Sequence, residues 1–177
     1  MTLGDVIKKI FKLIEEYDED GDVFTSDQDL ETKIKESIDD IQVELSQIKK
    51  IPALLQVELD GENNVIDKPA DMYRIKRCRE CKFEVLNDKI KFQDGYVGTA
   101  NVYYYKYPNI IDADTPNNYT MELTRDTIAC LVYGVASAIL KADVSSNYSV
   151  YEYKYQEMKQ LLSNNATDGL IEFEVIE

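Results

Sequence analysis

The spacing of apolar residues changes twice along this sequence, and that change limits the possible folds more than any other feature. Near both ends of the chain, apolar residues recur at steps of three and four, as on one face of an α-helix. Between residues 53 and 107 they alternate with polar residues in short runs separated by turn-forming pairs, as in β-strands. We therefore predict an α+β fold: a small α-helical bundle with an inserted antiparallel β element.

Four helices are predicted, over residues 2–17, 27–50, 121–141 and 149–162. Thr2 and Asp5 stand three residues apart at the start of the first helix, the spacing of a capping box. The second has a narrow apolar stripe and precedes Pro52, which is expected to end it. The third is predicted to be the most buried, with small residues on one face that let a neighbour approach closely: Ala129, Cys130, Gly134, Ser137 and Ala138.

The strand-rich insertion, residues 53–107, is predicted to hold several short antiparallel strands. Asn87-Asp88 separates two alternating runs, which is the pattern of a β-hairpin, and residues 100–107 are expected to form a further strand. The segment 169–177 alternates Ile171, Phe173 and Val175 with glutamates and is predicted to be an extended C-terminal tail. At 177 residues, the chain is expected to form a single domain over residues 1–177.

The charge and composition exclude several classes of function. The net charge of −14 disfavours tight binding to a phosphate backbone, which depends on Lys and Arg. The sequence has no histidine, the commonest general base and nitrogen ligand for metals. It also lacks an apolar run of about 20 residues, the length needed to span a membrane. We therefore expect a soluble protein that has no catalytic residues, binds no cofactor and does not associate with a membrane. A metal-dependent nuclease built on carboxylates is a further alternative, but the chain would lack a basic surface to bind its substrate.

The acidic segment after the first helix admits a calcium hypothesis. Aligned to the EF-hand loop, it places Asp18, Asp20 and Asp27 at the third, fifth and twelfth positions, with Gly21 at the sixth. Asp27 is shorter than the glutamate usual at position twelve. A solvated acidic turn leading into a helix cap accounts for the same residues, so a small acidic regulatory or calcium-binding module stays open as the alternative function.

Two further patterns carry chemistry in other proteins. Cys78 and Cys81 have C-x-x-C spacing, but without histidine and with only Cys130 left, a zinc ligand set is incomplete. We interpret the three cysteines as ordinary free thiols, buried or half-buried, in a reducing compartment. The run Tyr103-Tyr104-Tyr105 is interpreted as part of a half-buried strand rather than a platform for bases, because the local charge is judged too small for a nucleic-acid groove.

The order of these elements, together with four short phrases, resembles the head-tail connector, or neck adaptor (head completion), proteins of tailed bacteriophages. The phrases are FTSDQDL at 24–30, PADMYRI at 69–75, VYYYKYP at 102–108 and LVYGVA at 131–136. The resemblance extends over about residues 3–162, although this chain has a longer strand-rich middle than the most compact members.

This resemblance implies a non-enzymatic structural protein of the virion neck, made in the bacterial host cytoplasm. Such a subunit assembles into a ring, commonly a dodecamer, between the portal protein and the tail or stopper proteins. DNA passes through the ring without specific binding. An acidic wall suits that task because it repels phosphate instead of trapping it.

The alternation at the C-terminus generates a first prediction. Leu170, Ile171, Phe173 and Val175 are expected to dock on another subunit or on the portal, as strand addition to a neighbour does. Truncation after Asp168 should lower assembly or portal binding, as measured by sedimentation and co-purification, while circular dichroism of the monomer stays the same. Unchanged assembly would count against this docking.

Overall fold

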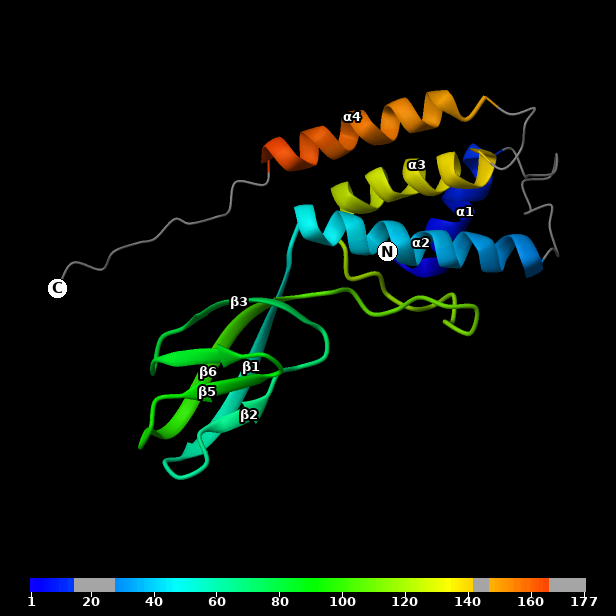
Figure 1. Cartoon of the computed structure of the whole chain (residues 1–177). Helices are drawn as coiled ribbons and strands as arrows, with labels where there is room; N and C mark the ends of the chain where they lie inside the picture. Colours follow the sequence, from blue (N-terminus) through cyan, green and yellow to red (C-terminus); the bar gives the residue numbers. More distant parts are fainter. Residues whose placement is uncertain (15–27, 142–146, 166–177) are drawn as a thin grey trace. The chain divides into compact units, whose positions relative to one another are not determined.

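The computed structural model describes residues 1–14, 28–141 and 147–165. Within them lie four helices and six strands (Figure 1). The helices are α1 (Leu3–Leu13), α2 (Gln28–Ile48), α3 (Arg125–Lys141) and α4 (Ser149–Asn165). The strands are β1 (Ile51–Asp60), β2 (Val65–Asp67), β3 (Met72–Cys78), β4 (Phe83–Leu86), β5 (Lys89–Phe92) and β6 (Val97–Lys106). The predicted α+β class is confirmed.

The chain divides into two compact units. The helical unit comprises Met1–Lys49 and Ile110–Glu177, and the β unit comprises Lys50–Asn109. The strand-rich insertion predicted within a single domain is thus a compact body of its own. No helix of the described residues is long and apolar enough to cross a membrane.

Helix boundaries follow from local contacts. At the start of α1, Thr2 and Asp5 form the predicted capping box, with backbone-to-side-chain hydrogen bonds of 3.0 and 3.2 Å. This helix ends at Leu13, with Ile14 as its C-cap, instead of continuing to residue 17. The predicted tail 169–177 lies outside the described residues. Helix α4 continues to Asn165 instead of ending at 162, since no glycine or proline interrupts it there.

Two further predicted boundaries were wrong. Helix α2 ends at Ile48 instead of residue 50, because Ile51 already pairs with Lys106 in β1. Pro52 does not end the helix but lies inside β1, where an edge strand tolerates its missing N–H group. Helix α3 starts at Arg125 instead of residue 121, because the Met121 N–H donates to the Met1 carbonyl and holds this segment extended.

Helix α3 contacts each of the other three helices and has the most buried residues of the four. Gly134 permits its closest approach: a Cβ atom built there would lie 2.9 Å from Cε2 of Tyr155 on α4. Ser137 donates to Glu152 of α4 at 2.9 Å, and Cys130 is fully buried. The predicted small-residue face is therefore confirmed at Cys130, Gly134 and Ser137, whereas Ala129 and Ala138 are exposed.

The segment between the β unit and α3 is anchored to the helices rather than being a loose polar link. The buried Lys35 of α2 donates to the carbonyls of Ala113 and Thr115 at 3.1 and 3.0 Å. Asp39, also on α2, accepts the Ile111 N–H at 2.8 Å. These bonds satisfy backbone groups that would otherwise be unpaired on the helical unit.

The β unit contains two antiparallel three-stranded sheets, in the orders β1-β6-β3 and β2-β5-β4. Side chains from both sheets share one core cluster, which includes Leu59, Ile90, Phe92, Val102 and Tyr104. The predicted hairpin is confirmed: Leu86 pairs with Lys89, and Asn87 has the positive φ of 51° that such a turn requires. The three-residue strand β2 was missed, because it is too short to show alternation.

The contact at Gly134 leads to a stability prediction. Gly134→Val should lower the free energy of unfolding by about 1–3 kcal/mol, because the added atoms collide with the Tyr155 ring and with Ile41. Urea unfolding followed by far-ultraviolet circular dichroism measures this loss. Ala138→Val, at an exposed position of the same helix, is the matched control and should cost well under half as much. Equal losses would show that the close approach is unimportant.

Candidate interaction surface

The outer face of the β1-β6-β3 sheet is the candidate functional site. Along β6, Ala100, Val102 and Tyr104 point into the core of the β unit and are buried. The residues between them, including Tyr103 and Tyr105, point to the opposite face and are half-buried. The alternation of β6 thus places two tyrosine rings side by side on a surface that the second sheet does not cover.

Cations of β3 lie over these rings because β3 pairs directly with β6. Arg77 is opposite Tyr103 in the register, and its guanidinium carbon lies 5.0 Å from the ring centroid. The Nζ atom of Lys76 lies 5.6 Å from the centroid of the Tyr105 ring. Lys50, which directly precedes β1, adds a third cation, with its Nζ atom 5.3 Å from the same centroid. Such distances are typical of cation–π contacts.

A β-bulge explains how neighbouring cations reach one face. Consecutive residues of a regular strand point to opposite sides, but the register of β3 against β6 shifts between Ile75 and Arg77. Lys76 is the extra residue, and both Lys76 and Arg77 consequently lie over tyrosine rings of the same face. We call this surface the cation–tyrosine face; it consists of Lys50, Arg74, Lys76, Arg77, Tyr103 and Tyr105.

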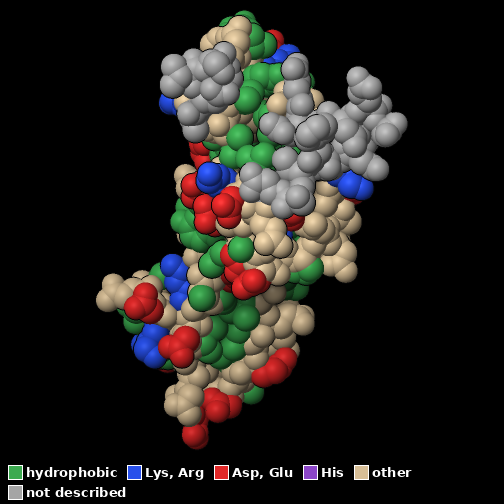
Figure 2. Space-filling view, turned by 90° about the vertical axis from the view of Figure 1, so that its right-hand side faces the viewer, with side chains coloured by type: hydrophobic (Ala, Val, Ile, Leu, Met, Phe, Trp, Pro, Cys, Tyr) green, Lys and Arg blue, Asp and Glu red, His purple; other side chains and the backbone are tan. Residues whose placement is uncertain are grey.

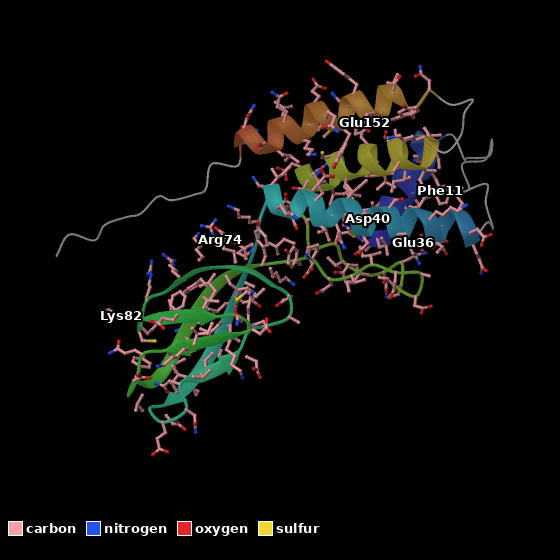
Figure 3. The ribbon with its side chains drawn as sticks, in the orientation of Figure 1. Phe11, Glu36, Asp40, Arg74, Lys82 and Glu152 are labelled. Carbon is pink, nitrogen blue, oxygen red and sulfur yellow. The ribbon has the colours of Figure 1, made fainter. Side chains whose placement is uncertain are left out.

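Three cations of this face have no carboxylate partner within the described part of the chain. All three are exposed and form no ion pair there: Arg74, Lys76 and Arg77. Arg74 is opposite Tyr105 in the register and is labelled in Figure 3. Elsewhere in the β unit, Lys89 pairs with Asp67 at 3.0 Å and Lys91 with Asp94 at 3.2 Å. The positive charge of the face is therefore available to a partner.

The far end of the same face is polar and internally hydrogen-bonded. Thr99 donates to Glu58 at 2.6 Å, Gln56 to Asn101 at 3.0 Å, and Asn101 in turn to Glu80 at 2.9 Å. The bond from the Asn101 side chain is the main cause that lowers the pKa of Glu80 to about 2. This end of the face is thus anionic, and its polar side chains form hydrogen bonds with one another, in contrast to the cationic end.

Charge is divided unequally between the two units. Ten of the 20 Lys and Arg residues but only nine of the 34 Asp and Glu residues lie within 50–109, which gives the β unit a charge of +1. The remainder of the chain therefore carries −15. On the described surface, hydrophobic side chains are also visible among the charged ones (Figure 2).

The cysteines are free thiols, and their burial matches the prediction. Cys78 and Cys81 are half-buried with their sulfur atoms 4.0 Å apart, and Cys130 is buried. Beside the pair lies an open hollow of about 730 Å³, lined by residues 78–84 and 91–94. No group of three His, Cys, Asp or Glu residues able to hold a metal ion occurs among the residues that the structure describes.

The other predicted site residues lie outside the described residues. These are the calcium-loop candidates Asp18, Asp20 and Asp27 and the docking candidates Leu170, Ile171, Phe173 and Val175. Both hypotheses stay predictions. The tyrosine run does form a half-buried strand as predicted, but the sequence analysis underestimated the charge around it, because the pairing of β3 with β6 cannot be inferred from the order of residues.

No known family model matches this chain, and no curated protein matches it.

Burial makes Cys81 a slow nucleophile. Burial, and to a lesser degree the neighbouring Cys78, raises the pKa of Cys81 to about 11. The thiolate is the reactive form, and a rise of two units from the ordinary value of 9.0 should slow alkylation by iodoacetamide near pH 7 by about 100-fold. Mass spectrometry after timed quenching measures the rate, which should rise as the pH approaches 11. In urea, Cys81 should react at the ordinary rate; equally fast labelling of the folded chain would contradict this.

Proposed function

We propose that this chain is a non-enzymatic structural adaptor of a phage or prophage virion neck, which assembles as a ring between portal and tail around the DNA channel. The observation that carries the proposal is the separation of charge into a helical unit of −15 and a β unit of +1. In the cation–tyrosine face of the β unit, Arg74, Lys76 and Arg77 have no ion-pair partner among the described residues. A subunit that joins different neighbours needs chemically different surfaces, and this chain has them.

The location of the resembling phrases supports the same proposal. PADMYRI leads into β3, VYYYKYP ends β6, and LVYGVA lies within α3. Each of these three phrases thus belongs to an element that either builds the cation–tyrosine face or packs the helical unit. In this proposal the four helices form a small bundle, the β unit is its insertion, and the C-terminal segment extends to a neighbour.

The acidic helical unit suits a channel through which DNA passes. A charge of −15 per subunit, multiplied around a ring, repels the phosphate backbone and prevents the duplex from adhering. The partners in this proposal are other copies of the chain, the portal protein, and tail or stopper proteins. The assembled protein resides in the virion neck after synthesis in the host cytoplasm.

Co-expression with the portal protein encoded near this gene tests the proposal. The two proteins should co-purify, and electron microscopy should show an added ring at one end of the portal. The matched control is the same portal co-expressed with an unrelated acidic protein, which should not add a ring. Absence of portal and capsid genes from the neighbourhood, or failure to co-purify, would refute the assignment.

A further inference from the structure

The cation–tyrosine face has the composition of a protein-binding surface. Tyrosine and arginine are the residue types that contribute most to protein interfaces, where their side chains combine apolar area with polar groups. Beside the tyrosines, Leu54 of β1 is opposite Tyr103 and is 49% exposed. Pro52, opposite Tyr105, is also exposed. The tyrosines of β6 therefore have exposed apolar residues of β1 on one side and the cations of β3 on the other.

A complementary surface lies on α2. Glu36 and Asp40 are four residues apart, so they occupy neighbouring positions on one side of the helix (Figure 3). Both are exposed, and neither has an ion-pair partner among the described residues. The buried residues of α2, such as Ile34, Ile38 and Leu45, lie on its other side. This outer side of α2 thus presents unpaired carboxylates.

We propose that the cation–tyrosine face of one copy binds the Glu36 and Asp40 side of α2 on a second copy. This inference deepens the proposed function, on which it rests for its biological meaning, by naming the surfaces that join neighbouring subunits. The guanidinium groups of Arg74 and Arg77 can each donate two parallel hydrogen bonds to one carboxylate. The two surfaces differ, so the contact is head-to-tail, the kind that generates rings.

Like-charge repulsion selects this arrangement over symmetric pairs. Two cation–tyrosine faces would bring Arg74, Lys76 and Arg77 of both copies together, and two α2 surfaces would bring four carboxylates together. Each such juxtaposition is unfavourable, whereas the mixed contact is favourable. The charge pattern therefore favours head-to-tail association over a closed dimer.

A nucleic acid is a poorer fit to this face than a second copy. The rings of Tyr103 and Tyr105 are half-buried and already have cations above them, so they offer little free area for stacking bases. The chain as a whole also carries −14, which repels a polyanion. The acidic helical unit of another copy needs no free ring area for stacking, and its carboxylates are attracted by the cations of the face.

Sedimentation of the full chain and two reversed variants tests the proposal. The wild type should self-associate at about 50 mM salt and dissociate at about 500 mM, because screening shortens the range of charge interactions. Arg74→Glu with Arg77→Glu, and separately Glu36→Lys with Asp40→Lys, should each weaken self-association at least tenfold. Mixing the two variants should restore it, because each then meets a partner of opposite charge.

Matched controls separate this contact from general charge effects. Lys68→Glu with Lys82→Glu changes the net charge as much as the arginine reversals do, but in the loops that follow β2 and precede β4; Lys82 is labelled in Figure 3. Asp114→Lys reverses one carboxylate at an exposed position of the helical unit, which is half the charge change of the α2 variant. Both controls should associate like the wild type, and circular dichroism should show all variants folded.

Several outcomes would overturn the inference. A wild type that stays monomeric at low salt up to millimolar concentration, or a mixture that fails to associate, would do so. The inference would also be overturned if truncation after Asp168 abolished association while the Glu36→Lys with Asp40→Lys variant still associated. Tighter binding of a labelled oligonucleotide than of a second copy, lost in the arginine variant, would assign the face to nucleic acid instead. Portal binding is measured separately, so failure of this contact and failure of the proposed function can be distinguished.

Discussion

Strand β6 forms hydrogen bonds along both of its edges, to β1 and to β3, and the rest of the β unit depends on this double pairing. It is one of the two longest strands, and its alternation assigns Val102 and Tyr104 to the core and Tyr103 and Tyr105 to the outer face. Without β3 beside it, β6 would present tyrosines with Lys50 over the Tyr105 ring but without the cations of β3. With β3 in place, the same tyrosines become the centre of a charged surface.

The β-bulge in β3 contributes to the cation–tyrosine face as much as the regular alternation of β6 does. Charged residues and bulges on an edge strand normally discourage pairing with another sheet. Here the bulge between Ile75 and Arg77 also gathers two cations on one face. The edge is thereby protected from strand addition, while its outer face is left available to an acidic surface. One local deviation thus serves both solubility and recognition.

The helical unit is organised around a close approach of α3 and α4. Gly134 allows the Tyr155 ring to lie against α3, and the Tyr155 hydroxyl donates to Glu44 of α2 at 2.7 Å. Burial, followed by this hydrogen bond, raises the pKa of Tyr155. Lys159 also binds Glu44, which leaves Glu44 engaged within the unit. Glu36 and Asp40, which precede Glu44 in α2, are exposed and have no such partner within the described part of the chain.

The sequence by itself determined the class of most described segments, although the short strand β2 was missed. Helical spacing, the Thr2–Asp5 capping box and the Asn87-Asp88 turn are local, because each depends on residues a few positions apart. The half-buried character of the thiols and the alternation in β6 were predictable for the same reason. The boundaries at Ile48 and Arg125 were not, since they depend on the pairing of Ile51 with Lys106 and on the bond from Met121 to Met1.

Only the tertiary structure decided which strands are neighbours, and with that the candidate site. All backbones carry the same hydrogen-bonding groups, so the residue order does not reveal that β6 lies between β1 and β3. Arg77 and Tyr103 are far apart in the sequence, with a complete hairpin between them, and meet only through this pairing. The sequence thus contained the cations and the tyrosines, but the long-range strand order combined them into one face.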